Sequence, residues 1–281
     1  MTQPVSKLYI VATPIGNLKD ISLRALEILA SVDLVAAEDT RHTRRLLDHF
    51  EIKQKLIAFH DHNERRQTDL LVDRIKAGES VALVSDAGTP LISDPGFRLV
   101  RAARAADVVV EAVPGASALT AALSVSGLPT DQFQFLGFLP AKGRATRLAE
   151  VSQYPGTIIL YEAPHRMASL LETVLEVLGG DRELVICREL TKLYEQVVQG
   201  LAGEVRDQMI RGEIPARGEF VVLISGATIV QSVAQIELDD CLRLLIAELP
   251  ISKAAELAGK MLGLKRNLVY KRALALKAEA G

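Results

Sequence analysis

The sequence predicts an α/β protein made of two α/β domains and a small, all-helical C-terminal segment. Short apolar runs alternate with helix-length amphipathic segments up to residue 126. The alternation becomes less regular beyond Gly127-Leu128-Pro129-Thr130, and only helical patterns follow a polar linker from Ser225 to Gln235. These changes predict domains at residues 1–126, 127–226 and 237–281.

The first domain should contain five strands that alternate with helices. Val81 to Val84 is apolar throughout, which suits a strand buried on both faces. Asp94 and Pro95 are the residues expected at a helix N-cap and first helical position. Alternating strands and helices indicate βαβ units and a mainly parallel sheet. The expected strands are Leu8 to Thr13, Leu34 to Ala37, Lys55 to Phe59, Val81 to Val84 and Val108 to Val113; the helices include Ala25 and Leu29, end at Phe50, end before Gly78, begin near Pro95 and run through Ala122.

The loops after these five strands should lie at one edge of the sheet, because right-handed crossovers return each strand in the same direction. Ligands of open α/β sheets bind at that edge. The loops expected there are 14–18, 38–45, 60–64, 85–93 and 114–117.

The second domain has a less regular strand spacing, which predicts mixed strand directions. Its expected strands are Phe133 to Leu139, Thr157 to Tyr161, Leu184 to Arg188, Glu195 to Val198 and Phe220 to Ile224, with helices that carry Lys142, Arg144 and Arg147, span Met167 to Val177 and end near Ile210.

The sequence pattern of the C-terminal segment predicts three short helices, Leu238 to Leu249, Ser252 to Leu262 and Asn267 to Ala278. From Ser252 to the end it holds seven Lys or Arg against two acids, a local charge of about +5. A helix, a glycine turn and a basic helix resemble a helix-turn-helix. A small bundle with a solvated basic face explains the same pattern.

Composition sets further bounds. The net charge of −2 gives no overall basic field, so a nucleic-acid site has to be a local patch. The N-terminus lacks an apolar signal region, and no stretch approaches about 18 uninterrupted apolar residues, which predicts a cytoplasmic protein that does not bind a membrane. Cys187 and Cys241 have no metal-ligand spacing, so we interpret both as buried hydrophobes and expect no metal site.

The loop from Ser85 to Asp94 is the strongest candidate for ligand binding. A GxxxxGK[ST] motif is absent, as is GxGxxG after the first strand, which disfavours triphosphates and nicotinamide cofactors. Carboxylates and hydroxyls beside backbone amides suit a ligand with hydroxyls and a positive charge. S-adenosylmethionine has ribose hydroxyls, an ammonium group and a sulfonium group. Alternatively, Asp86 and Asp94 only cap turns.

A series of motifs spans nearly the first 225 residues: Leu8 to Leu18, Ala37 to Arg41, His60 to Glu64, Ser85 to Gly96, Gly137 to Pro140, Tyr161 to Arg166, Arg188 to Lys192 and Gly218 to Val221. In these motifs the chain resembles the bacterial ribosomal RNA small-subunit methyltransferase I family, cytidine 2′-O-methyltransferases of the tetrapyrrole methylase superfamily. The C-terminal segment fits through Lys253-Ala254-Ala255 and Lys265 to Lys271.

The resemblance implies two α/β domains of the tetrapyrrole methylase type with S-adenosylmethionine in the cleft between them. It also implies a homodimer that methylates a cytidine ribose of 16S ribosomal RNA in the decoding region of the small subunit. The residues that it places against the cofactor are Pro14, Gly16, Asn17, Ser85, Asp86, Ala87, Gly88, Leu91, Ser117, Ala118, Tyr161, Glu162, Ala163 and Leu190.

Methyl transfer is an in-line displacement in which the protein mainly orients the hydroxyl against the methyl group. A ribose 2′-hydroxyl is a poor nucleophile unless its proton is accepted, and the candidate bases at the cleft, unranked, are Asp39, His42, Glu162 and Lys192. Phosphate contacts are expected from basic residues that could equally form solvated helix faces: Arg41, Arg44, Arg45, Arg166, Lys265, Arg266, Lys271 and Arg272.

Two other functions compete with this one. A corrinoid-type C-methyltransferase of the same superfamily would keep the cofactor and change the acceptor, but a small tetrapyrrole needs no remote basic segment. A non-catalytic RNA-binding assembly protein would use the fold as a scaffold and would not need to bind S-adenosylmethionine.

Overall fold

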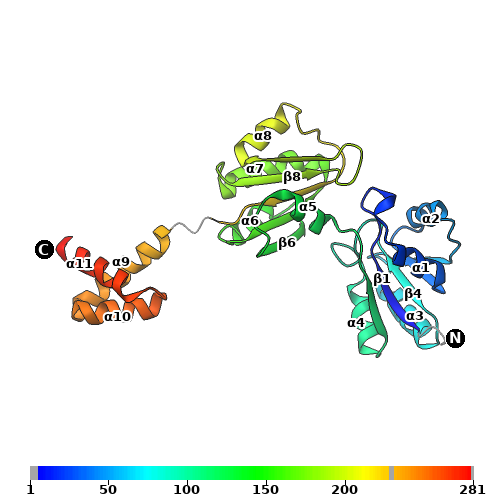
Figure 1. The fold of residues 1–281 in the computed structure, drawn as a ribbon, viewed down its shortest axis with the longest axis horizontal. Coiled ribbons are helices and arrows are strands. Elements are labelled where there is room, and N and C mark those ends of the chain that lie inside the picture. The colour runs from blue at the N-terminus through cyan, green and yellow to red at the C-terminus, as the bar shows by residue number, and fades with distance from the viewer. Residues whose placement is uncertain (1–5, 228–230, 280–281) are drawn as a thin grey trace. The chain divides into compact units, whose positions relative to one another are not determined.

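The computed structural model describes residues 6–227 and 231–279. The chain divides into two compact units, residues 1–226 and 227–281 (Figure 1). The described residues of the first unit form two five-stranded sheets, and those of the second form three helices. In the part of the chain that is described, no helix is both long and apolar enough to cross a membrane.

The first sheet has the strand order β3-β2-β4-β1-β5. Every neighbouring pair in it is parallel, which confirms the prediction for this half of the unit. Its strands are β1 (Lys7–Val11), β2 (Leu34–Ala37), β3 (Leu56–Ala58), β4 (Val81–Val84) and β5 (Val109–Val113).

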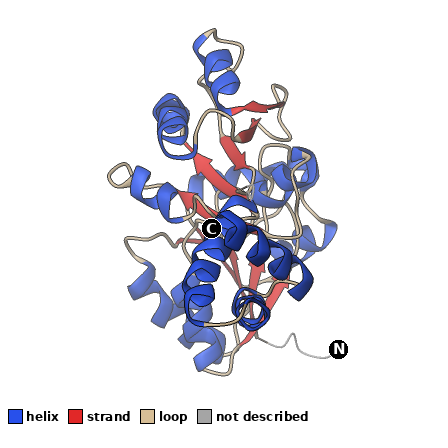
Figure 2. Ribbon diagram, turned by 90° about the vertical axis from the view of Figure 1, so that its left-hand side faces the viewer, coloured by secondary structure: helices blue, strands red, loops and turns tan. Residues whose placement is uncertain are grey.

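Helices cover both faces of this sheet, which explains why β4 is apolar and buried throughout (Figure 2). On one face Leu71 and Leu99 pack against the strands, and on the other Leu29 and Leu47 do so. The covering helices are α1 (Leu23–Ser31), α2 (Thr40–His49), α3 (Glu64–Lys76) and α4 (Phe97–Ala105), with a short 3-10 turn, η1 (Leu18–Asp20), before α1.

The loops after β1, β2 and β4 meet at the carboxyl edge of the sheet, as predicted. Thr13 and Gly88 form an antiparallel bridge with N–O distances of 2.8 and 3.0 Å. The backbone N–H of Asp39 donates to the carboxylate of Asp86 at 3.0 Å. Three loops that are distant in sequence are therefore connected by hydrogen bonds.

The predicted start of the helix after β4 was wrong. The helix α4 begins at Phe97, after Gly96 with φ of +135°, and Asp94 does not cap it. A side chain at Gly96 would place its Cβ 2.7 Å from Leu83, so the position also requires glycine for space. The carboxylate of Glu64 accepts hydrogen bonds from the N–H groups of Gly96 (3.0 Å) and Arg98 (3.2 Å). A residue of α3 thus supplies the cap.

The second sheet has the order β6-β7-β10-β8-β9. Only β6 and β7 pair in parallel, so the prediction of mixed strand directions is confirmed. One face packs against Leu148, Leu170 and Val205 of three helices. Its strands are β6 (Phe133–Phe138), β7 (Thr157–Glu162), β8 (Glu183–Arg188), β9 (Gln196–Leu201) and β10 (Phe220–Ile224), and its helices are α6 (Arg144–Glu150), η2 (Pro164–Arg166), α7 (Met167–Leu178) and α8 (Ala202–Ile210).

The other face of the second sheet is covered by α5 (Ala118–Ser126), which follows β5 of the first sheet. Ala122 and Leu123 of α5 pack against Ile159 and Val221. The loop before α5, at 114–117, is thereby attached to both sheets. The predicted boundary between residues 126 and 127 stays a prediction, with α5 contributing to the second core.

The second unit consists of α9 (Gln231–Glu248), α10 (Ile251–Leu262) and α11 (Arg266–Glu279). Leu242, Ala255 and Val269 form its core. The predicted linker was partly wrong, because α9 begins at Gln231 rather than Leu238; residues 228–230 of that linker lie outside the described residues.

Replacing Glu64 by Ala should destabilise the first unit by about 1–2 kcal/mol, because two N–H groups at the start of α4 lose their acceptor. The measurement is urea unfolding followed by circular dichroism. Asp69→Ala, at an exposed site of the same helix, is the matched control. Equal unfolding midpoints for the two variants would contradict the capping role.

Candidate functional site

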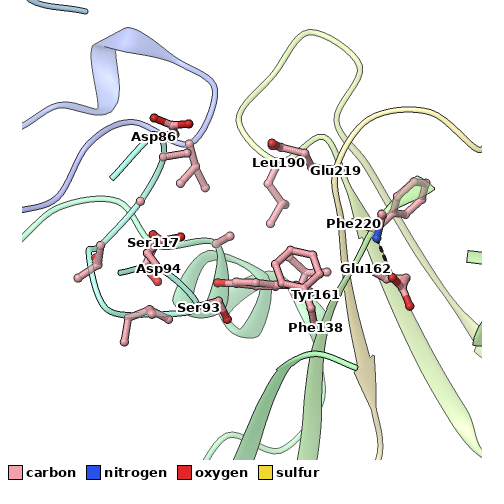
Figure 3. A pocket seen from close by; sticks show the side chains of 18 of the residues that line it. Asp86, Ser93, Asp94, Ser117, Phe138, Tyr161, Glu162, Leu190, Glu219 and Phe220 are labelled. Carbon is pink, nitrogen blue, oxygen red and sulfur yellow. Dashed lines mark hydrogen bonds between the residues drawn. The ribbon is translucent and has the colours of Figure 1, made fainter. Parts of the chain in front are cut away.

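A first cavity of about 400 Å³ opens where the strand-end loops of the first sheet face the second sheet (Figure 3). Asp86, Asp94 and Ser117 lie on one side, and Tyr161 and Leu190 lie on the other. The loops on the first side follow β4 and β5, so the cavity lies at the carboxyl edge predicted from the strand pattern.

The first side of the cavity is acidic. Glu38, Asp86 and Asp94 line it, and none of them forms an ion pair with a Lys, Arg or His among the described residues. Burial raises the pKa of Glu38. Burial also raises the pKa of Asp94 to about 6, with a hydrogen bond from Ser85 acting against it and neighbouring carboxylates adding to it. The cavity therefore presents negative charge that the described protein residues leave uncompensated.

The opposite side of the cavity is largely apolar and aromatic. The ring of Tyr161 lies edge-on to those of Phe135 and Phe138, with centroid distances of 4.8 and 5.6 Å. Burial raises the pKa of Tyr161 to about 12, so its phenol stays neutral. Leu190 and Val221 extend this surface. A flat heterocycle fits such a wall better than a phosphate does.

Glu162 also borders the cavity, but its carboxylate is already occupied. It lies 3.2 Å from both the Arg144 and the Arg166 guanidinium groups and accepts the N–H of Ala163 at 2.9 Å. Its side chain is only 1% exposed. Arg166 additionally donates to the carbonyl oxygen of Leu139. This buried network fixes the loops after β6 and β7.

A second cavity, of about 270 Å³, lies next to the first. Ile15, Asp86, Ala87 and Glu219 line both. The residues that line only the second include three basic side chains and the loop after β1: Pro14, Gly16, His42, Arg45 and Lys192.

Lys192 reaches the second cavity from the loop after β8. Its ammonium group donates to Glu189 (2.8 Å) and Glu219 (2.9 Å). Burial acts to lower the pKa of Lys192, but these two hydrogen bonds outweigh it and raise the pKa, so the group stays protonated. A Cβ at Gly16 would lie 2.4 Å from Cγ of Lys192, so the lysine side chain occupies the space that a side chain at Gly16 would need.

The structure places most of the predicted cofactor residues together. Pro14 and Gly16 line the second cavity instead of the first, and Asn17 accepts a hydrogen bond from the N–H of Lys19. Ser85 and Leu91 support the loop without lining either cavity. The predicted residues that line the first cavity are Asp86, Ala87, Gly88, Ser117, Ala118, Tyr161, Glu162, Ala163 and Leu190.

The residues predicted as bases or as phosphate contacts in the first unit do not all lie at the cavities. Asp39 lines neither cavity: it caps α2, and its hydrogen bonds with Arg41 lower its pKa to about 2. Arg44 donates to the carbonyl oxygen of Gln54 at 3.0 Å, which gives it a structural partner. Arg41 and Arg45 are exposed, and Arg45 borders the second cavity.

In the second unit, Lys265, Arg266 and Lys271 are exposed on or beside α11. Arg272 is half-buried and binds Asp239 of α9 at 2.7 Å. Arg272 therefore helps to hold the helices together.

Several lining residues were not among the predicted site residues: Glu38, Ser93, Asp94, Phe138, Cys187, Glu219, Phe220 and Val221. Glu38, Ser93 and Asp94 belong to loops that the strand-end rule places at the ligand-binding edge, but they were not assigned individually to the cofactor. Glu219 and Phe220 are near the cavity because β10 lies in the centre of the second sheet, beside β7. Spacing alone does not reveal that order.

Solved structures share this fold. The methyltransferase CobJ is 18% identical, with a TM-score of 0.59 over 79% of this chain and 94% of that one. The uroporphyrin-III C-methyltransferase of Thermus thermophilus, in complex with S-adenyl homocysteine, is 19% identical with a TM-score of 0.54 over 78% of this chain and 97% of that one. At these sequence identities, the structural similarity establishes only that this chain has the same fold as the two methyltransferases.

The family models are more specific. Residues 7–206 match tetrapyrrole (corrin/porphyrin) methylases and residues 232–277 match the RsmI C-terminal HTH domain. Proteins named ribosomal RNA small subunit methyltransferase I are 51% identical in Pseudomonas aeruginosa, over 95% of this chain and 96% of theirs, and 49% identical in Vibrio cholerae, over 94% and 93%. The chain belongs to the tetrapyrrole methylase family and, within it, to the ribosomal RNA small subunit methyltransferase I group. The predicted fold class and family are confirmed.

Replacing Asp94 by Asn should stabilise the ligand-free protein at neutral pH. The native pKa of Asp94 is raised from 3.8 to about 6, so its contribution to stability is present below pH 3.8 and is lost as the pH rises through about 6. The melting temperature of Asp94→Asn should exceed that of the unmodified protein at pH 7.5, and the difference should shrink toward pH 5.

Differential scanning calorimetry across this pH range is the measurement. Asp69→Asn, which removes one exposed carboxylate, is the control and should not reproduce the gain. A lower melting temperature for Asp94→Asn at pH 7.5 would show that the carboxylate is stabilised in the native state.

Proposed function

We propose that this protein transfers the methyl group of S-adenosylmethionine to the 2′-hydroxyl of a cytidine ribose in 16S ribosomal RNA, in the decoding region of the small subunit. The observation that supports it most directly is the first cavity, where three carboxylates without a basic partner face an aromatic and apolar wall. A nucleoside that carries positive charge fits both sides of that cavity.

The residues present suit the cofactor in detail. Asp86, Asp94 and Glu38 compensate the sulfonium and ammonium charges and can accept from ribose hydroxyls. Tyr161, Phe138 and Leu190 offer a surface for the adenine ring. When bound, the cofactor supplies an electrophilic methyl group and a good leaving group. The protein then has to exclude water and orient the acceptor.

The acceptor is proposed from the family and from the distribution of charge. The relatives in this group are named for ribosomal RNA of the small subunit. Exposed cations of the first unit include Arg41 and Arg45 of α2, and those of the second unit include Arg266 and Lys271 of α11. A tetrapyrrole C-methyltransferase has no use for a basic helical unit. Because ribosomal RNA is a cytoplasmic substrate, we also propose that the protein acts in the cytoplasm.

The protein is further proposed to act as a homodimer. Leu193 and Tyr194 are 89% and 70% exposed, and the nearby edge strand β9 exposes Val197 and Leu201. Apolar side chains at an exposed sheet edge are consistent with a partner subunit. Sedimentation velocity would test the dimer independently of the activity.

Two measurements test the function. Isothermal titration calorimetry should show S-adenosylmethionine binding to the unmodified protein, and weaker binding to Asp86→Ala. Ribose-methylation mapping of 16S ribosomal RNA should show one cytidine whose 2′-O-methyl group is lost without the gene and restored with it. No cofactor binding, or an unchanged methylation map, would contradict the proposal.

The basic surface of α11 should contribute to substrate binding and not to cofactor binding. The triple variant Lys265→Gln, Arg266→Gln, Lys271→Gln should raise the KM for small subunits, by roughly tenfold for a few lost phosphate contacts, while the calorimetric affinity for S-adenosylmethionine stays the same. The double variant Lys253→Gln, Lys260→Gln, on α10 beside Glu256, is the control. Normal KM for the triple variant would exclude α11 as an RNA contact.

A further inference from the structure

We infer that the second cavity receives the target nucleotide and that His42 accepts the proton of its 2′-hydroxyl. This inference rests on the proposed function and assigns the acceptor side of the same reaction. It also proposes that the loop from Pro14 to Gly16 contacts the acceptor instead of the cofactor.

The two cavities differ in charge in the way that the two substrates require. The first is lined by Glu38 and Asp94, which suit a cation. Arg45 and Lys192 line only the second, together with the carboxylates of Asp86 and Glu219 that both cavities share, so basic groups that suit the phosphates flanking a ribose line the second cavity and not the first. The first cavity therefore favours the cationic cofactor, whereas the second offers basic side chains that can contact phosphate.

The residues that line both cavities form a shared wall, which brings the two substrates next to each other. Ile15, Asp86, Ala87 and Glu219 line both cavities, so ligands in the two lie on either side of the same few residues. The bridge between Thr13 and Gly88 fixes the loop after β1 against the loop after β4 at this wall. A methyl group held in the first cavity is then adjacent to a hydroxyl held in the second.

Three of the four candidate bases are unsuited to accept a proton there. Asp39 lines neither cavity, and its low pKa makes it a weak base. Glu162 is enclosed between two guanidinium groups on the far side of the first cavity. Lys192 already carries its proton, because of the carboxylates of Glu189 and Glu219.

His42 remains, in the first turn of α2 at the wall of the second cavity. Its ring forms no hydrogen bond with the described residues, so a ring nitrogen is available to a ligand. The other carboxylates at the shared wall have different tasks: Glu219 binds Lys192, and Asp86 belongs to the acidic side that faces the cofactor.

Lys192 is a positioning residue in this arrangement. Glu189 and Thr191, on either side of Leu190, both have left-handed backbone, with φ of +52° and +68°. Such a backbone is unfavourable for these residues, and here it directs Leu190 into the first cavity and Lys192 into the second. The fixed ammonium group can then hold a phosphate beside the loop at Gly16.

The proton and electron balance of the step is simple. The 2′-oxygen forms a bond to the methyl carbon as the carbon–sulfur bond breaks, and the electron pair of that bond goes to sulfur. The hydroxyl proton passes to the ring nitrogen of His42, and the imidazolium returns it to water. The balance requires no oxidant or reductant.

The main experiment measures single-turnover methyl transfer to small subunits from cells without the gene. His42→Ala should lower the rate by about 10²-fold or more, while its affinities for S-adenosylmethionine and for the subunit stay within twofold of the unmodified protein. Added imidazole should restore part of the rate. His49→Ala, at the other end of the same helix and away from both cavities, is the matched control and should keep the full rate.

A second experiment tests the cavity without relying on catalysis. The affinity for the substrate RNA is measured over a range of salt concentrations for Arg45→Gln and for Arg66→Gln, an exposed residue of α3. Arg45→Gln should reduce the slope of log K against log salt by about 0.7–1, as expected for one lost phosphate contact. Arg66→Gln should leave the slope unchanged.

The outcomes separate this inference from the proposed function. A full rate in His42→Ala, or a lost rate that imidazole does not restore, would overturn the role of His42. A loss of rate in Asp86→Asn with intact cofactor affinity would assign the base to Asp86 instead. An unchanged salt slope in Arg45→Gln would contradict the binding of RNA in the second cavity. Failure of the unmodified protein to methylate any subunit would contradict the proposed function itself.

Discussion

The pairing of β1 with β4 in the middle of the first sheet determines where the site forms. The chain passes from β1 to the far side of β4 and returns to fill the gap, so that loops from both ends of the domain meet. The bridge between Thr13 and Gly88 continues this pairing beyond the strands. Both cavities share the residues on either side of that bridge, Ile15 and Ala87. A change in strand order would separate the two cavities.

The acidic side of the first cavity destabilises the folded protein, and a bound cationic ligand can offset this destabilisation. Burial of Asp94 and Glu38 without a basic partner disfavours their charged forms. The buried carboxylate of Glu162, in contrast, has two guanidinium partners. The protein therefore neutralises the carboxylate that holds its loops and leaves uncompensated the ones that face a ligand. Unpaired charge of this kind is typical of functional sites.

The sequence could predict the first sheet and its active edge because both follow from local rules. Apolar strands, turn residues and right-handed crossovers suffice to place the loops at 38–45 and 85–93 on one edge. The cap of α4 could not be predicted in this way, because Glu64 comes from another helix. Glu219 was missed for a similar reason: its place depends on the central position of β10 in the second sheet. Long-range pairing has no local signal.

The same distinction applies to the motif from Pro14 to Asn17, which the family resemblance assigns to the cofactor. Only tertiary structure shows what covers that motif. Lys192, from the loop after β8, fills the space above Gly16 and adds a positive charge to it. The second sheet thus alters the chemistry of a loop of the first. In a protein of this architecture, the loop after β4 can keep one cofactor while the residues opposite the loop after β1 select the acceptor. Acceptor specificity is then expected to depend on α2 and on the loop after β8, where His42, Arg45 and Lys192 lie.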